Sequence, residues 1–151
     1  MDARAPVLFV LCAECGPAGR LVAALDPAAV LQTFGGVENP DDPAIRATIE
    51  YAVRQQGVRS ILVCGHTGCR ARAEPTREES RATVVAQCRR LRDDKAIGAL
   101  LQAHRVVVRP VLFDEAEGDV FLCSYEGDRL TLLDDEAFGR LLASSAVDRT
   151  T

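Results

Sequence analysis

Two apolar runs in this sequence each end on residues that can bind a metal. The run Val7–Leu11 leads into Cys12 and Cys15, and the run Ile61–Val63 leads into Cys64-Gly-His-Thr-Gly-Cys69. Short apolar runs bounded by turn residues predict buried strands. In an open parallel sheet the carboxyl ends of the strands meet at one end of the sheet, and ligands bind there. The two runs therefore predict a parallel sheet that brings Cys and His side chains together.

Cys12, His66 and Cys69 would form a donor set of two thiolates and one imidazole. These donors, held on rigid backbone, favour Zn²⁺ with its tetrahedral preference, whereas copper(I) and iron fit less naturally. Either half alone is weak evidence, because a cysteine at a strand end is often just a small buried hydrophobe. The pairing of the two halves predicts one zinc ion at this end of the sheet.

Apolar runs and helical patterns alternate along the chain, which favours an α/β fold with a parallel sheet flanked by helices. Strands are expected at residues 7–12, 30–34, 58–64, 106–113, 120–123 and 130–133. Helices are expected at 41–57, at 78–103 with a break near 93–95, and at 134–142. An acidic loop at 114–119 is expected to join two of the strands. We expect residues 1–151 to form a single domain, with 144–151 as a frayed tail.

Composition and charge exclude several classes of function. The chain has 151 residues, 48% of them hydrophobic, which is enough for one domain with its own core. Its net charge of −4 and its pI near 5.2 argue against nucleic acid as a partner, because phosphate binding needs a basic surface. The apolar run at residues 7–11 is too short to span a membrane. Six cysteines without a secretory signal favour a reducing compartment, so we expect a cytoplasmic protein.

The motif Cys64-Gly-His-Thr-Gly-Cys69 resembles a zinc turn of the beta-class carbonic anhydrases, which reads C-G-H-x-x-C-G in that family. The preceding helix and strand, Ala47–Val53 and Val58–Val63, also fit the family, and weaker similarity covers most of the chain. The resemblance implies a parallel-cored sheet flanked by helices, with zinc on the two cysteines and the histidine named above. It also implies a homodimer or a higher even oligomer.

The chain departs from the family at the other zinc turn. Where the family has C-x-D-S-R, this sequence has Cys12-Ala-Glu-Cys-Gly16, so Glu14 replaces the Asp and Gly16 replaces the Arg. In the family that Arg holds the Asp away from zinc, which leaves the fourth ligand position open for water. Arg70 replaces the family's Gly after the second turn, and Gln32–Gly36 keeps only one Gly of the family's R-N-A-G-N segment.

Three arrangements of the fourth ligand position follow, and all three stay open. In the first, water occupies the position, and zinc turns it into hydroxide that attacks a small electrophile. Glu14 then relays the proton, and Arg70 supplies the cation that is missing at Gly16. In the second, Glu14 itself binds zinc and closes the site. In the third, Cys15 completes a closed site of three cysteines and one histidine, as in structural zinc sites.

These arrangements predict different functions. The open site predicts a zinc lyase or hydrolase that acts on carbon dioxide or a similar small electrophile, with Glu14 and Arg70 as catalytic residues and bicarbonate as the product. A closed site predicts a catalytically inactive protein that keeps zinc for stability and serves binding or assembly. A third class, a thiol redox protein that uses Cys12 and Cys15, leaves His66 and Cys69 without a purpose.

Overall fold

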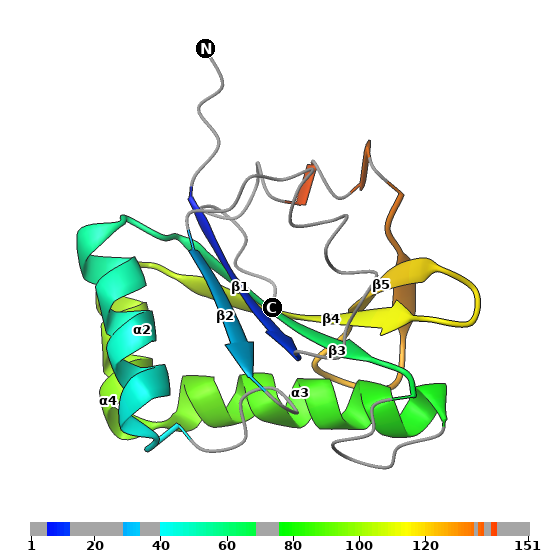
Figure 1. Ribbon diagram of the computed structural model, residues 1–151, viewed down its shortest axis with the longest axis horizontal. Helices are drawn as coiled ribbons and strands as arrows, with labels where there is room; N and C mark the ends of the chain where they lie inside the picture. The colour runs from blue at the N-terminus through cyan, green and yellow to red at the C-terminus, as the bar shows by residue number, and fades with distance from the viewer. Residues whose placement is uncertain are drawn as a thin grey trace.

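The computed structural model describes residues 6–12, 29–33, 40–68, 76–134, 136–137 and 140–141. Over these residues the chain forms a six-stranded sheet in the order β2-β1-β3-β4-β5-β6 (Figure 1). The strands are β1 (Val7–Cys12), β2 (Ala29–Thr33), β3 (Ser60–His66), β4 (Val107–Asp114), β5 (Asp119–Cys123) and β6 (Leu130–Leu132). The first four run parallel to one another, whereas β5 and β6 are antiparallel to their neighbours.

The central strands are apolar along their length because both faces of the sheet are covered. All six residues of β1 are buried, and so are residues 60–64 of β3. Their side chains alternate between two separate apolar clusters, one on each face of the sheet. Strands of a parallel sheet that is packed on both faces are continuous hydrophobic runs. The two apolar runs of the sequence are therefore neighbours here, with Leu8 paired to Ile61 and Leu11 to Cys64.

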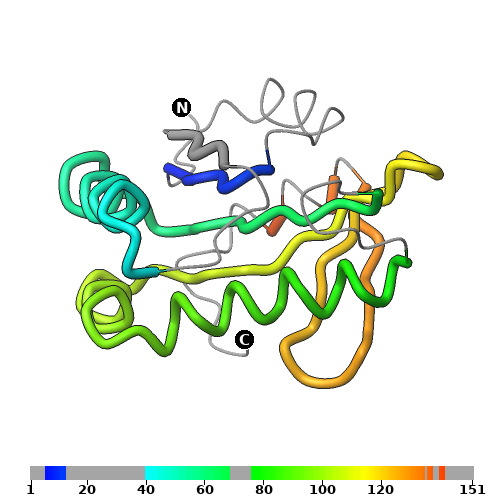
Figure 2. The backbone as a smooth tube through the Cα atoms, turned by 60° about the horizontal axis from the view of Figure 1, so that its bottom comes forward, coloured from blue at the N-terminus to red at the C-terminus, as the bar shows by residue number. Residues whose placement is uncertain are grey.

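Three of the helices within the described residues pack on this sheet. They are α2 (Pro43–Gln55), α3 (Arg77–Asp93) and α4 (Lys95–Ala103). α3 runs along one face of the sheet, while α2 and α4 lie together at one end of the molecule (Figures 1 and 2). The core beneath α3 is apolar and includes Val63, Val84, Cys88, Leu91 and Leu112. Among the described residues, none of the helices combines the length and apolar character needed to cross a membrane.

Each helix begins at a residue whose side chain accepts hydrogen bonds from backbone amides of the first turn. Asp42 caps α2, with Pro43 at the first helical position, and Thr76 caps α3. Asp94 ends α3 and also caps α4, because its carboxylate accepts from the amide of Ile97 at 2.9 Å. Such caps satisfy amides that have no partner within the helix. The double role of Asp94 explains the break between α3 and α4.

The fold expected from the sequence is confirmed, with bounds that shift by a few residues. The sheet is mixed, with a parallel part flanked by helices, and the break in the long helical region falls at residue 94. Of the last expected helix, the described residues 136–137 and 140–141 are helical. The expected tail at 144–151 lies outside the described residues.

An ion pair ties the start of α3 to the end of β4. Nε and Nη2 of Arg77 donate to Oδ2 of Asp114 at 3.0 and 2.5 Å, and the guanidinium lies 4.9 Å from the ring centroid of Phe121. Oδ1 of Asp114 accepts from the amides of Ala116 and Glu117, which closes the turn between β4 and β5. The Arg77 guanidinium, aided by these amides, holds the pKa of the Asp114 carboxyl below its usual value.

We predict that Gly98→Ala destabilises the protein, although alanine is the better helix former by about 1 kcal/mol. A Cβ at position 98 would lie 2.4 Å from the carbonyl oxygen of Arg92, so α3 and α4 must move apart. Overpacking of this kind costs on the order of 1–3 kcal/mol. Because a backbone atom cannot rotate away, the upper end applies, and urea denaturation should show a net loss of about 1–2 kcal/mol.

Gly118→Ala is the matched control for this prediction. Gly118 has φ 75°, and a Cβ added there would meet no atom within 4 Å, so only the left-handed backbone opposes the change. Its cost should be about 1 kcal/mol. An unchanged or raised stability of Gly98→Ala would contradict the close contact between α3 and α4.

We also predict that the Arg77–Asp114 pair makes the fold sensitive to acid. Because the pKa of Asp114 is lowered in the folded protein, the pair contributes stability above the pKa of the unfolded carboxyl, about 3.9. That stability is lost as the pH falls through the lower, folded value. Asp114→Asn should therefore be less stable at pH 7 and should show a smaller fall in unfolding free energy between about pH 5 and 2.

Urea denaturation at several pH values tests this, with Glu117→Gln as the control in the same turn. Glu117 is exposed, and it contributes its backbone amide, which the substitution keeps. An identical pH dependence in Asp114→Asn and the unmodified protein would contradict the role of the pair.

Candidate metal site at the carboxyl ends of β1 and β3

The sheet carries Cys12 and His66 to the same end. Cys12 is the last residue of β1 and His66 is the last of β3, and these strands are parallel neighbours paired as far as Leu11 and Cys64 (Figure 1). Both side chains are buried, each at 3% exposure. Two of the three predicted metal ligands are thus on adjacent strand ends, the position at which parallel sheets bind ligands.

The other predicted site residues lie outside the described residues. They are Glu14, Cys15, Cys69 and Arg70. Within the described part of the chain, no group of three His, Cys, Asp or Glu side chains could hold a metal. The complete ligand set, the fourth ligand and the two catalytic residues therefore stay predictions.

Two glycines shape the backbone on either side of His66. A Cβ on Gly65 would lie 3.0 Å from the Cβ of Val84, so the absence of a side chain lets the end of β3 pack closely on α3. Gly68 has φ 70°, in the left-handed region that glycine adopts without strain. These two glycines therefore allow the backbone on either side of His66 to follow this path.

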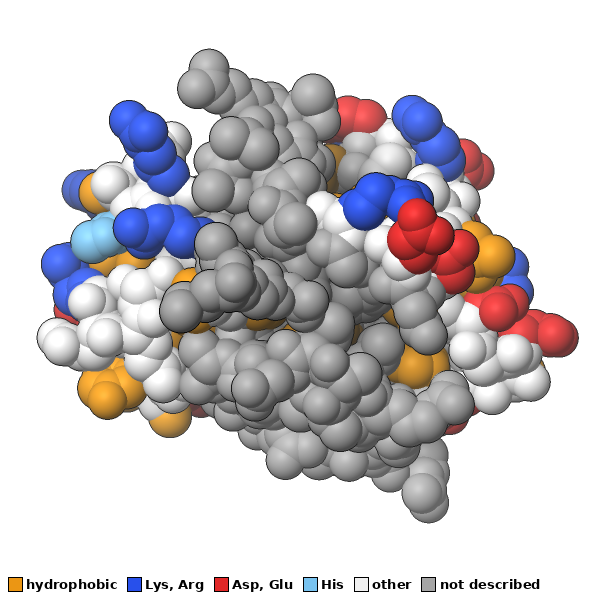
Figure 3. All heavy atoms as spheres, turned by 90° about the horizontal axis from the view of Figure 1, so that it is seen from above, with side chains coloured by type: hydrophobic (Ala, Val, Ile, Leu, Met, Phe, Trp, Pro, Cys, Tyr) orange, Lys and Arg blue, Asp and Glu red, His pale blue; other side chains and the backbone are white. Residues whose placement is uncertain are grey.

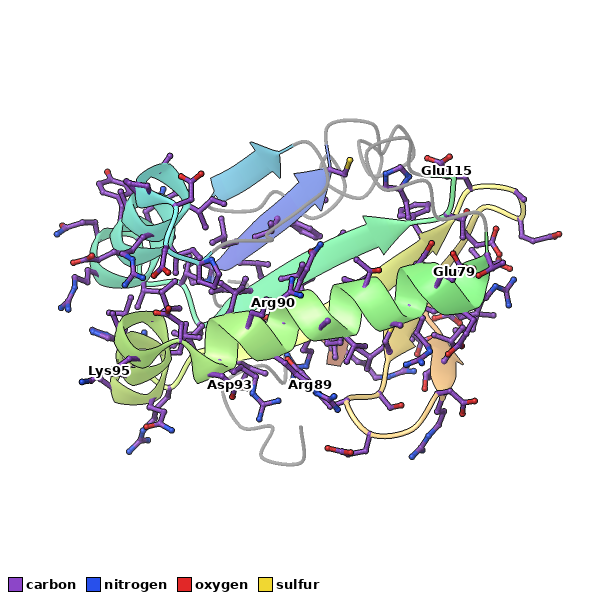
Figure 4. All side chains as sticks on the ribbon, turned by 90° about the horizontal axis from the view of Figure 1, so that it is seen from below. Glu79, Arg89, Arg90, Asp93, Lys95 and Glu115 are labelled. Carbon is purple, nitrogen blue, oxygen red and sulfur yellow. The ribbon has the colours of Figure 1, made fainter. Side chains whose placement is uncertain are left out.

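The turn between β4 and β5 holds His66 in place. Nδ1 of His66 lies 3.1 Å from Oε1 of Glu115 and 3.1 Å from the carbonyl oxygen of Thr67. The amide of Thr67 donates to the carbonyl of Phe113 at 3.0 Å, and the amide of Glu115 donates to Oγ1 of Thr67 at 3.0 Å. Figure 4 shows Glu115 at the same end of the molecule as Glu79 in the first turn of α3. The contacts within the turn after β3 and the contacts to the β4–β5 turn therefore both hold His66 in place.

These contacts determine which ring nitrogen of His66 can act as a ligand. Because Nδ1 faces a carboxylate and a carbonyl, it carries the proton of the neutral imidazole, and Nε2 keeps its lone pair. Nε2 is buried and has no hydrogen-bond partner in the described part of the structure. Such an atom costs about 1–3 kcal/mol if it stays unsatisfied. A metal ion would satisfy it, and metal-binding histidines usually present their other nitrogen to a carboxylate or carbonyl in this way.

The described surroundings of His66 are acidic. The β4–β5 turn contributes Asp114, Glu115, Glu117 and Asp119, of which Asp114 is paired with Arg77. Acidic side chains also gather at the end of the molecule away from α2 and α4 (Figure 3). A surface of this sign attracts cations. Both the unsatisfied Nε2 and the local charge thus fit zinc, the metal that the donor set favours.

Glu115 is a site residue that the sequence pattern did not predict. It belongs to the acidic loop at 114–119, for which only a connecting role was expected. Glu115 is 49 residues from His66, and only the parallel pairing of β3 with β4, which sets His66 beside Phe113, brings the two together. The strand order would have been needed to find it.

Comparisons with known proteins agree with this fold. Residues 20–80 match the family model described as carbonic anhydrase. Comparison with curated protein sequences gives no significant match. Among solved structures, the beta-carbonic anhydrase CafD of the fungus Aspergillus fumigatus is similar, with 20% identity and a TM-score of 0.65. That comparison covers 82% of this chain and 91% of CafD.

Two further solved structures are also similar to this chain in fold. A tetrameric beta-carbonic anhydrase from the ascomycete Sordaria macrospora has 19% identity and a TM-score of 0.63, covering 80% of this chain and 81% of that chain. A Coccomyxa beta-carbonic anhydrase in complex with acetazolamide has 15% identity and a TM-score of 0.60, covering 97% of this chain and 86% of that chain.

At such low sequence identity the solved structures establish the fold alone. The family model adds a sequence match over the segment that contains His66 and its turn. The chain therefore has the α/β fold of the beta-carbonic anhydrases, and its residues 20–80 match the carbonic anhydrase family model.

Proposed function

We propose that this protein binds zinc and converts carbon dioxide and water into bicarbonate and a proton. The observation that supports this best is the buried, unsatisfied Nε2 of His66, beside the end of β1 that carries Cys12. Its Nδ1 is held by Glu115, as is typical of a metal-binding histidine. The proposed reaction is that of the carbonic anhydrases, to which the chain is similar in sequence over residues 20–80 and in fold.

Cys12, His66 and Cys69 would hold the metal. Zinc bound there would supply a Lewis acid that lowers the pKa of water toward neutrality. Glu115 is a positioning residue, because it acts through the orientation and tautomer of His66. Glu14 would accept the proton released from water, in the role that the family gives to an aspartate. Arg70 would attract the anionic product.

A closed zinc site is the second candidate. The observation that favours it is in the sequence, where Glu14 and Gly16 replace the Asp and Arg that keep the family's site open. With Glu14 or Cys15 as the fourth ligand, the protein would keep zinc for stability and serve binding or assembly. The proposed enzyme requires that neither side chain occupies the fourth position.

We further propose an even oligomer, a homodimer or larger, in the cytoplasm. The tetrameric beta-carbonic anhydrases of Sordaria macrospora support the first part. Two of the described cysteines, Cys88 and Cys123, are buried free thiols, which suits a reducing compartment.

Glu115→Gln should weaken zinc binding. Partners that orient a ligating histidine typically contribute about 10- to 100-fold in metal affinity. Competition against a chromophoric chelator should show a loss of that size, and His66→Ala should lose more. Glu117→Gln changes an exposed carboxylate in the same turn and should bind zinc like the unmodified protein. Equal affinities in Glu115→Gln and Glu117→Gln would contradict the role of Glu115.

The same titration separates the open site from the closed ones. Glu14→Gln or Cys15→Ser should weaken zinc binding only if the substituted side chain is the fourth ligand. Unchanged affinity in both variants supports the open site that the enzyme needs.

Carbon dioxide hydration should depend on zinc. Stopped-flow assays of protein with quantified zinc should show a rate above that of the metal-stripped protein, and the rate should rise with pH as water ionises. Glu14→Gln should lower this rate by about 100-fold or more, which is the usual contribution of a general base. Absence of any rate from fully zinc-loaded protein between about pH 6 and 9 would overturn the proposed activity and leave the closed site.

A further inference from the structure

Helix α3 contacts the ends of β3 and β4 on the face of the sheet opposite to His66. A Cβ on Gly65 would lie 3.0 Å from the Cβ of Val84 in α3, so position 65 faces this helix. Because successive side chains of a strand point to opposite faces, His66 faces away from α3. The first residue of α3, Arg77, contacts the end of β4 through its ion pair with Asp114. The helix therefore holds two neighbouring strand ends from behind the candidate metal site.

The carboxylate of Asp114 joins this ion pair to the β4–β5 turn. Its Oδ2 accepts both bonds from Arg77, while its Oδ1 accepts from the amides of Ala116 and Glu117 at 3.1 and 3.3 Å. The backbone carbonyl of Asp114 accepts from the amide of Gly118 at 2.7 Å. Asp114 is buried at 6% exposure, so loss of Arg77 would leave a buried carboxylate without its charged partner. The conformation of the β4–β5 turn therefore depends on Arg77.

Glu115 follows Asp114 directly, and its side chain contacts His66. Oε1 of Glu115 lies 3.1 Å from Nδ1 of His66, although the Glu115 side chain is 34% exposed. Packing alone does not fix a glutamate that is exposed to this extent, because ordering its long side chain costs conformational entropy. The position of the Glu115 carboxylate therefore depends on the backbone of its turn, where the Glu115 amide donates to Oγ1 of Thr67 at 3.0 Å.

We propose that Arg77 and Asp114 are positioning residues of the zinc site. Their ion pair holds the β4–β5 turn so that Glu115 meets Nδ1 of His66, which keeps Nε2 available to the metal and raises the affinity for it. Both residues act through Glu115, since their contact lies on the face of the sheet opposite to His66. The inference rests on the proposed zinc binding and identifies a part of the fold that tunes it from outside the ligand set.

Charge and positioning predict opposite effects for one of two variants that remove the ion pair. Arg77→Gln removes a positive charge, which by Coulomb interaction alone should strengthen the binding of a cation. Asp114→Asn removes a negative charge, which by the same interaction should weaken it. The positioning role predicts weaker zinc binding in both variants. Arg77→Gln therefore separates the two explanations by the sign of its effect.

Competition against a chromophoric chelator measures these effects in the full chain. Arg77→Gln and Asp114→Asn should each weaken zinc binding by about threefold or more, as is usual for coupling within one hydrogen-bond network. Each variant is also combined with Glu115→Gln. In that background neither should weaken zinc binding further, because the contact through which both act is already lost.

Arg81→Gln is the matched control variant. It removes the same charge one helical turn further along α3, where Arg81 pairs with Glu78 and donates to the carbonyl of Gly127. Both partners lie outside the β4–β5 turn. The zinc affinity of Arg81→Gln should therefore equal or exceed that of the unmodified protein.

The tautomer of His66 gives a second measurement that needs no zinc. Nitrogen-15 NMR of the metal-stripped protein, at a pH where the imidazole is neutral, should show the proton on Nδ1 of His66. Arg77→Gln should increase the share of the tautomer with the proton on Nε2. The chain has two histidines, so His104→Gln assigns the signals. If Asp114→Asn does not fold, Arg77→Gln supplies the test, since the Arg77 side chain is 44% exposed.

Three results would overturn the inference. The first is that Arg77→Gln binds zinc as tightly as the unmodified protein or more tightly. The second is a loss of affinity that stays the same in the Glu115→Gln background, because that loss would reflect a general effect on the fold. The third is an unchanged tautomer ratio in Arg77→Gln. Absence of zinc binding in the unmodified protein would instead overturn the proposed function, and the tautomer would still test the link between Arg77 and His66.

Discussion

Parallel pairing of β1, β3 and β4 is the constraint on which the candidate site depends. Because these strands point the same way, their last residues, Cys12, His66 and Asp114, all lie at one end of the sheet. The turn that follows each strand can then contribute side chains to the same small volume. If one of these three strands ran antiparallel to the other two, the turn that follows it would lie at the opposite end of the sheet.

His66 is a predicted metal ligand whose buried imidazole costs the fold stability. The imidazole is buried with one nitrogen satisfied twice and the other not at all in the described structure. The hydrogen bonds that join its turn to the β4–β5 turn oppose any rotation that would bring Nε2 to water. Local violations of this kind are expected at functional sites, where the surrounding structure compensates for them.

Much of the fold could be predicted from the sequence because its signals are local. Continuous apolar runs mark the buried strands, and the Asp93-Asp94-Lys95 stretch marks the break between α3 and α4. The contact between Glu115 and His66 could not be predicted, because it depends on which strands are neighbours and in what register. Arg109 sits in an apolar run that predicts a strand, but its complete burial there emerges only from the structure.

Asp94 has a consequence for how the molecule moves. Besides ending α3 and capping α4, it accepts from Nη2 of Arg46 on α2 at 3.4 Å. One carboxylate therefore links three helices at the end of the molecule remote from His66. Opening any one of these helices weakens the bonds that hold the other two. In hydrogen exchange this end should behave as one cooperative unit, whose opening leaves the strand ends around His66 in place.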